Sequence, residues 1–163
     1  MGRRFALVAV SLAAIFATGC GSSGSSKTGQ LRFMQASPSA PHVDLLIDNT
    51  TQASNLAYGN TTGYLTVKVG NRRLDAVPVN STSAILDLSV PITENGNTTV
   101  LLTGSTGSIK SLTLTDGGTT STTGDGYVRV LNASVSMGAA DVYIVAAGSG
   151  ILGTNQKMER TLV

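Results

Sequence analysis

The chain of 163 residues contains one cysteine, one histidine and no tryptophan. A single cysteine cannot close a disulfide within the chain, so the fold must be held by packing and hydrogen bonds. One histidine and one cysteine also fall short of the ligand set of a zinc site. We therefore expect no metal and no cofactor.

Charged residues are scarce as well, at 12% of the chain, and the two signs nearly balance. Eleven basic residues stand against nine acidic ones, and two of the basic residues, Arg3 and Arg4, lie at the extreme N-terminus. The other basic residues form no cluster. Nucleic-acid binding relies on a basic patch, so we expect no nucleic-acid partner.

Residues 1–19 have the three-part layout of an export signal, with a basic start, an apolar stretch and small residues. The apolar stretch, residues 5–16, is shorter than the roughly 20 residues that span a bilayer. It is followed by Ala17-Thr18-Gly19-Cys20, which resembles the cleavage region of bacterial lipoproteins. The residues themselves also permit a plain secretory signal with a chance cysteine, or a buried free cysteine.

The resemblance to lipoproteins implies cleavage before Cys20, diacylglycerol on its thiol and an acyl group such as palmitate on its amine. Anchoring by several acyl chains is stable, whereas one chain is marginal. The resemblance therefore implies a bacterial cell-envelope protein held at the membrane through Cys20. Gly21 stands where some inner-membrane lipoproteins carry aspartate, which favours the outer membrane over the inner.

Beyond a flexible Gly/Ser tether at residues 20–29, the chain is rich in Val, Leu, Ile and Thr with frequent Gly, Asn and Asp. Apolar and polar residues alternate with a period of two, the pattern of half-buried strands. Asn95-Gly96 between two such runs is a strong hairpin signal. We expect almost no helix, and seven strands near residues 31–36, 42–48, 64–69, 72–77, 84–90, 98–103 and 109–115.

The chain repeats itself after a Gly/Thr/Ser linker at residues 116–126. Arg32 and Arg129, like Asp44 and Asp141, are separated by 97 residues, so the two copies align without a gap. Residues 31–37 correspond to 128–134, and residues 43–47 correspond to 140–144. The sequence thus predicts a main β-domain at residues 30–115 and a truncated second copy at residues 127–163.

Several segments of the first copy resemble the bacterial envelope domain known as domain of unknown function 4397. The matching segments are Leu31-Arg32-Phe33, Ala36-Ser37-Pro38, Val43-Asp44, Leu56-Ala57-Tyr58-Gly59 and Thr62-Gly63-Tyr64-Leu65. The resemblance implies an exported or lipid-anchored β-rich domain, often present in two copies. It brings no established catalytic residues. We expect an antiparallel immunoglobulin-like or transthyretin-like β-sandwich of about seven strands.

Four residues are candidates for a ligand or partner surface: His42, Asp44, Tyr58 and Tyr64. His42 is the only histidine, yet Ser37-Pro38 and Ala40-Pro41 before it are more typical of a turn than of a catalytic arrangement. Asp44 is expected to solvate a strand or fix a turn. Each tyrosine is expected to pack its ring and hydrogen-bond its hydroxyl near a strand end.

These observations favour a lipid-anchored envelope protein with a structural or interaction role and no enzymatic activity. Its partner would be another envelope protein or a cell-wall component. The alternatives are a surface lipoprotein that binds a glycan or a peptide, and then a hydrolase. A deep pocket lined by Tyr58, Tyr64 and His42 would favour the first alternative, and a Ser or Asp within reach of His42 the second.

Overall fold

The structure is a computed structural model that describes residues 26–117, 128–134, 136–145, 147–148 and 156–157. Cys20 and the signal predicted from the sequence lie outside these residues. The described part of the chain contains strands and no helix that could cross a membrane. The strands are β1 (Thr28–Gln35), β2 (Val43–Ile47), β3 (Thr50–Leu56), β4 (Leu65–Lys68), β5 (Gly70–Pro78), β6 (Leu86–Ile92), β7 (Asn97–Ser105), β8 (Ser108–Asp116), β9 (Tyr143–Ile144) and β10 (Gln156–Lys157).

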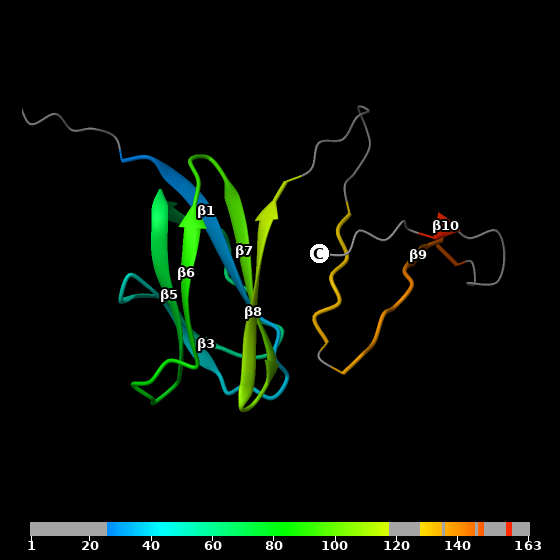
Figure 1. Ribbon diagram of the computed structural model, residues 1–163, viewed down its shortest axis with the longest axis horizontal. Helices are drawn as coiled ribbons and strands as arrows, with labels where there is room; N and C mark the ends of the chain where they lie inside the picture. The colour runs from blue at the N-terminus through cyan, green and yellow to red at the C-terminus, as the bar shows by residue number, and fades with distance from the viewer. Residues whose placement is uncertain (1–25, 118–127, 135, 146, 149–155, 158–163) are drawn as a thin grey trace, which may run out of the picture.

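Eight of these strands form two four-stranded sheets that face each other (Figure 1). Sheet A has the order β4-β1-β7-β8, and sheet B has the order β3-β2-β5-β6. The short strands β9 and β10 pair separately. The all-β sandwich predicted from the sequence is confirmed, with one parallel pair, β1 with β7, among antiparallel neighbours.

The structure adds one strand, β3, to the seven expected in the main domain. β3 lies at an edge of sheet B, and most of its residues are exposed on both faces. It therefore lacks the alternation by which half-buried strands are predicted. Asp48 and Asn49 connect it to β2 with φ angles of 48° and 63°, as a two-residue type I′ hairpin requires.

The prediction of a hairpin at Asn95-Gly96 is wrong, although a turn is present there. The Gly96 N–H donates to the Thr93 carbonyl at 3.1 Å, and Asn95 has a φ of 55°. The turn leads from β6 in sheet B to β7 in sheet A, which do not pair with each other. The dipeptide thus specifies the reversal of the chain but not the strand that is paired next.

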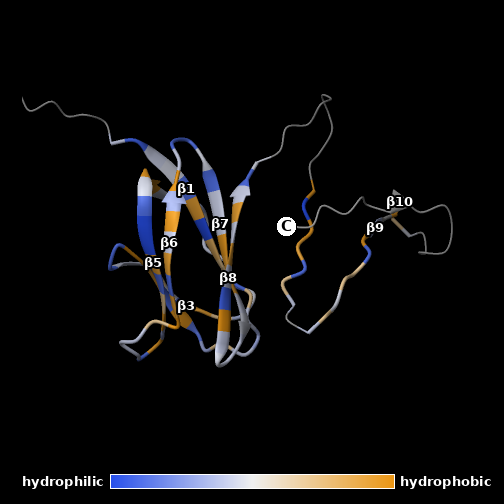
Figure 2. Ribbon diagram, viewed as in Figure 1, coloured by the Kyte–Doolittle hydropathy of each residue, from blue (hydrophilic) through white to orange (hydrophobic). Residues whose placement is uncertain are grey.

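The core lies between the two sheets and follows the alternation in the sequence (Figure 2). In β1 the residues Leu31, Phe33 and Gln35 point inward, whereas Arg32 and Met34 lie on the outer face of sheet A. β1 begins at Thr28, inside the segment predicted as a tether. Gly29 lies so close to the Thr93 carbonyl oxygen that a β-carbon at this position would collide with it. The core comprises Leu31, Phe33, Val43, Leu45, Ile47, Leu56, Val67, Leu74, Ala76, Val90, Ile92, Val100 and Leu102.

The second copy reproduces a local feature of the first without its strand. The Ser37 N–H donates to the Gln35 side-chain oxygen at 2.7 Å, and the Ser134 N–H donates to that of Asn132 at 3.1 Å. Residues 128–134 nevertheless form no strand, although the corresponding residues 31–37 include most of β1. The physical reason is that no neighbouring strand pairs with them within the described residues, so their backbone lacks a ladder.

Candidate functional site

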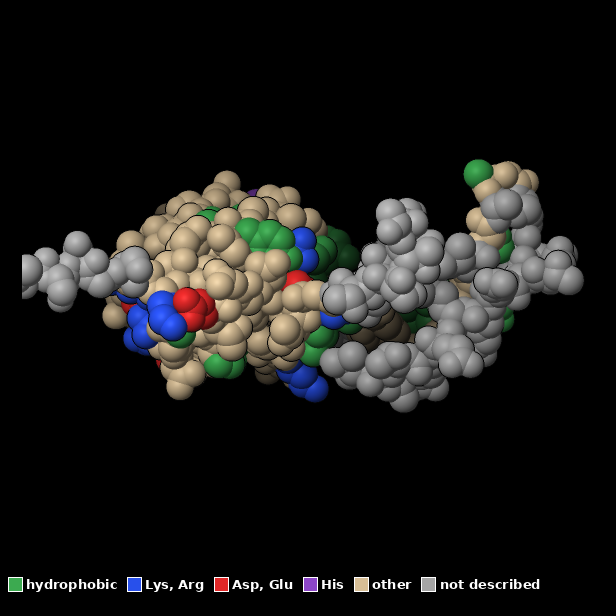
Figure 3. Space-filling model, turned by 90° about the horizontal axis from the view of Figure 1, so that it is seen from above, with side chains coloured by type: hydrophobic (Ala, Val, Ile, Leu, Met, Phe, Trp, Pro, Cys, Tyr) green, Lys and Arg blue, Asp and Glu red, His purple; other side chains and the backbone are tan. Residues whose placement is uncertain are grey.

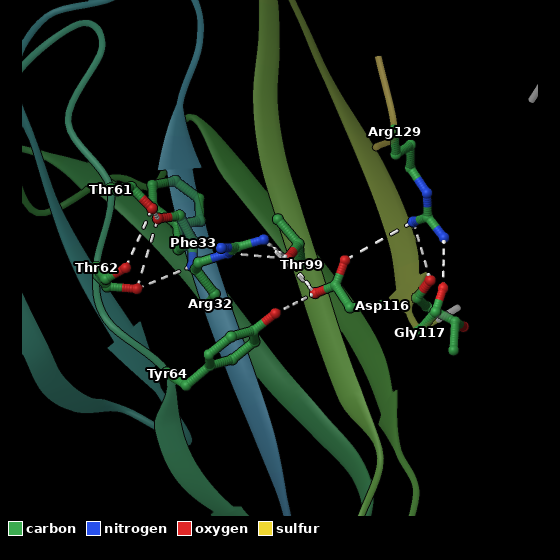
Figure 4. A network of polar contacts seen from close by, with 10 residues as sticks. Arg32, Phe33, Thr61, Thr62, Tyr64, Thr99, Asp116, Gly117 and Arg129 are labelled. Carbon is green, nitrogen blue, oxygen red and sulfur yellow. Dashed lines mark hydrogen bonds and ion pairs between the residues drawn. The ribbon is translucent and has the colours of Figure 1, made fainter. Parts of the chain in front are cut away.

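The carboxylate of Asp116, the last residue of β8, is the centre of a polar network on the outer face of sheet A (Figure 4). The Tyr64 hydroxyl donates to Asp116 Oδ2 at 2.9 Å, and the Thr99 hydroxyl donates to the same oxygen. These residues come from the segment before β4, from β7 and from β8. The carboxylate therefore connects three separate parts of the sheet.

Arg32 on β1 completes this network from the middle of the sheet. Its Nε and Nη2 donate to Thr99 Oγ1 at 3.1 and 3.0 Å, because β1 and β7 place the two residues opposite each other. The guanidinium also lies 4.8 Å from the centre of the Tyr64 ring, within cation–π range. Its Nη2 is 3.8 Å from Asp116 Oδ2, so the ion pair is a long one.

Arg129 approaches Asp116 from the second copy. Its Nη1 lies 3.7 Å from Asp116 Oδ1 and donates to the Thr115 carbonyl at 3.0 Å, while Nη2 donates to the Gly117 carbonyl at 3.4 Å. Arg32 and Arg129 hold equivalent positions in the two copies. One carboxylate is therefore flanked by two equivalent guanidinium groups, and the cluster has an excess of positive charge.

Tyr64 keeps its proton in this environment. Partial desolvation raises the pKa of its phenol, and the hydrogen bond to Asp116 together with the negative charge of that carboxylate raises it further. The positive charge of Arg32 opposes this effect but does not cancel it. The phenol is consequently a hydrogen-bond donor at neutral pH and not a nucleophile.

The network borders a groove of about 380 Å³. Leu101 on β7 and Leu114 on β8 are each only 5% exposed although they point away from the core. Leu131 of the second copy lines the groove from the opposite side. The groove residues are the apolar Met34, Leu101, Leu114 and Leu131, together with Arg32, Thr61, Tyr64, Thr99, Asp116, Gly117 and Arg129.

The four residues proposed from the sequence do not form one site. His42 and Asp44 meet at Asn55, whose side-chain oxygen lies 2.8 Å from His42 Nδ1 and whose N–H donates to Asp44 Oδ1 at 2.8 Å. Asn55 has a φ of 56° and lies where the pairing of β2 with β3 is irregular. The side chains of His42 and Asp44 therefore stabilise this irregular part of the sheet. Tyr58 is 60% exposed, and neither it nor His42 lines the groove that contains Tyr64.

A second polar cluster lies on sheet B. Arg73 Nη2 is 3.2 Å from Asp75 Oδ1 and 3.0 Å from Asp87 Oδ2, and the two aspartates are opposite each other on β5 and β6. Burial raises the pKa of Asp75, and the nearby charge of Arg73 only partly offsets this. Among the described residues, no three His, Cys, Asp or Glu side chains are close enough to hold a metal ion.

Sequence reasoning did not identify Arg32, Thr99 or Asp116 as site residues. One signal was available, because the arginine at position 32 recurs at position 129, in both cases between two apolar residues. An arginine in the middle of a strand must lie on the outer face, where it needs partners from adjacent strands. The partners could not be named, because Thr99 is 67 residues away from Arg32 in the chain.

A comparison with protein families matches residues 29–143 to the model of a domain of unknown function, DUF4397. The chain belongs to the DUF4397 family. The DUF4397 match begins in β1 and extends past the end of β8 to Tyr143, so it includes Arg129 as well as Arg32. No curated protein matches the chain.

Proposed function

We propose that this DUF4397 protein is a lipid-anchored, non-enzymatic interaction module of the bacterial cell envelope. The N-terminal segment supports the anchor, because residues 1–19 have the layout of an export signal and end directly before Cys20. β1 begins at Thr28, so only a short segment would separate the lipid from the folded domain. Such a module would act on partners close to the membrane surface.

The observation that carries the interaction role is the arrangement of the groove on sheet A. A hydroxyl beside a carboxylate, as in Thr99 and Asp116, is also found at catalytic sites. Here Arg32 donates to Thr99 Oγ1 from two nitrogens, Nε and Nη2. These contacts engage the lone pairs with which the oxygen would attack a substrate. The groove is therefore better suited to binding than to bond cleavage.

The surface of the domain supports the same role. In the view from above, most of the surface is neither apolar nor charged, and acidic and basic side chains lie beside each other in small groups (Figure 3). The face seen in this view lacks the dense gathering of basic side chains that steers nucleic acids to a protein. A neighbouring envelope protein or a cell-wall component is the partner class that this surface favours.

A surface lipoprotein that binds a glycan or peptide is the second candidate. The volume of the groove, about 380 Å³, falls in the range of small-ligand sites. The exposed ring of Tyr58 is available to a sugar face. A hydrolase has less support, because among the described residues His42 is bonded to Asn55 and to no serine or aspartate side chain.

The test uses the full chain in its native envelope. A photo-crosslinker placed beside the groove, in place of Thr61, should capture a reproducible partner, and Cys20→Ser should leave the protein in the soluble fraction or unprocessed. A crosslinker at Gln52 on β3, exposed on sheet B, is the matched control. Normal processing and membrane retention of Cys20→Ser would reject the anchor. Hydrolytic turnover that is lost in a folded Thr99→Val variant would reject the non-enzymatic role.

A further inference from the structure

We propose that the groove on sheet A binds an aliphatic carboxylate, with the carboxylate at Arg32 and Arg129 and the aliphatic chain on the leucines. This inference rests on the proposed function, since it names the chemistry that the interaction site would recognise. It concerns a short ligand segment, such as a fatty acid or the C-terminus of a peptide, because the groove measures only about 380 Å³.

The charge of the groove determines the sign of the ligand. Arg32 and Arg129 carry two positive charges, and Asp116 supplies one negative charge that both of them share. Their distances to the carboxylate oxygens, 3.8 and 3.7 Å, exceed the roughly 2.7–2.9 Å of a close charge-assisted hydrogen bond. The carboxylate of Asp116 is also occupied by the hydroxyl groups of Tyr64 and Thr99. Each guanidinium therefore retains attraction for a second anion.

Arg32 has the donors that such an anion needs. Its hydrogen bonds to other described residues use Nε and Nη2, so the N–H groups of Nη1 are left for a ligand. Stacking on the Tyr64 ring and bonding to Thr99 hold the guanidinium in one orientation. A fixed guanidinium binds a carboxylate with less loss of side-chain entropy than a mobile one.

The remainder of the groove is apolar. Met34, Leu101 and Leu114 project from three adjacent strands, and Leu131 faces them from the second copy. Leu101 and Leu114 are already nearly buried. An aliphatic chain in this position would therefore remove from water mainly its own surface and that of the partly exposed Met34 and Leu131, which contributes about 25 cal/mol for each Å² buried. A hydrophilic anion such as inorganic phosphate would gain nothing from these side chains. The combination of cationic and apolar groups therefore favours an amphipathic ligand.

The experiment titrates the soluble protein, residues 26–163, with octanoate and with an acetylated dipeptide that ends in leucine and a free carboxylate. Uncharged octanol and the C-terminal amide of the same peptide are the paired ligand controls. Binding is measured by calorimetry and by NMR chemical shifts. We expect at least one of the acids to bind about tenfold or more tightly than its uncharged partner, as a charge-assisted contact implies.

Two variants locate the binding. Arg32→Gln and Arg129→Gln should each weaken binding of the acid by about tenfold, and Arg129→Gln changes no residue of the sandwich strands. Lys110→Gln on β8 removes an equal charge outside the groove and should change the affinity by less than about twofold. Circular dichroism verifies that each variant is folded. The acid that binds more tightly identifies the source of the ligand, and either result supports the proposal.

Three results would overturn the inference. The first is that neither acid binds. The second is that each acid binds no more tightly than its uncharged partner. The third is that both arginine variants bind the acid with full affinity. Crosslinking of an envelope partner without binding of either acid would reject this inference and leave the interaction role intact. Binding of an acid without any crosslinked partner would reject the interaction role and support this inference.

Discussion

The hydroxyl of Tyr64, the residue before β4, donates a 2.9 Å hydrogen bond to the carboxylate of Asp116 at the end of β8. β4 and β8 are the two edge strands of sheet A, with β1 and β7 between them. The bond therefore crosses the outer face of the sheet and passes beside Arg32 and Thr99 (Figure 4). A side-chain contact of this kind holds together strands that have no backbone hydrogen bonds to each other.

Replacement of Tyr64 by phenylalanine should measure the value of this contact. Tyr64→Phe removes the hydroxyl but keeps the ring on Arg32, so the free energy of unfolding should fall by about 1–2 kcal/mol. The same change at the exposed Tyr58 is the control and should have an effect within about 0.5 kcal/mol. Urea titration of both variants gives the two values. Equal stabilities would show that the bond contributes nothing to the fold.

Asp75 should make stability depend on pH. Its pKa is raised in the folded state, mainly by burial. The protonated carboxyl group therefore contributes its full stability below the unfolded-state pKa of about 3.9. This contribution is lost as pH rises through the higher folded-state pKa. Asp75→Asn cannot ionise and should gain stability relative to the parent between about pH 3 and pH 7. Denaturant melts at a series of pH values test this. A difference that does not change with pH would contradict the raised pKa. Glu94→Gln, an exposed change of equal charge, is the control.

Gly29 should not tolerate a side chain, although it lies at the end of the segment that the sequence predicts to be a flexible tether. A β-carbon at this position would collide with the Thr93 carbonyl oxygen and with the Ile92 side chain. Gly29→Ala should therefore lower the free energy of unfolding by about 1–3 kcal/mol. Gly63→Ala is the matched control, because no atom beyond its immediate chain neighbours lies within 4 Å of its added carbon. If the two variants were equally stable, β1 would have to begin after Gly29.

Removal of the second copy should destabilise the first. A chain that ends at Gly124 loses Arg129, which bonds to two backbone carbonyls, and Leu131, which borders the groove beside Leu114. We expect a lower melting temperature, with about 4–8 °C for each kcal/mol lost, and stronger binding of a hydrophobic dye. Thermal melts and sizing of both chains provide the measurement. An unchanged melting temperature with an unchanged monomeric state would show that the contacts of the second copy are without consequence for the sandwich.

The sequence predicts the fold well wherever a strand has one buried face. Leu31, Phe33 and Val43 show the alternation because packing between the sheets requires it. β3 was not predicted from the sequence, because both of its faces are exposed and its apolar and polar residues therefore do not alternate. At Asn95-Gly96 the turn is predictable from the dipeptide, but the pairing that follows depends on β1, which hydrogen-bonds to β7 in the other sheet.

The candidate site was less predictable than the fold, because the residues that form it are far apart along the chain. Arg32 and Thr99 become neighbours only because β1 and β7 pair in parallel with that register. Asp116 then reaches Thr99 because β8 returns antiparallel to β7. Local patterns contain no information on such registers, so the sequence indicates β1, β7 and β8 as strands but not the side chains that meet on their outer face.

The position of β1 has a consequence for the order in which the domain can form. β1 precedes the other described strands in the chain, yet its partner β7 lies 67 residues later in register, as Arg32 and Thr99 show. Pairing over such a separation is slow, because the loop must close before the contacts form. β1 therefore cannot form its parallel pair until β7, which ends at Ser105, is available. If Cys20 carries a lipid as proposed, the anchor and β1 both precede in the chain the strand β7 that completes the centre of sheet A.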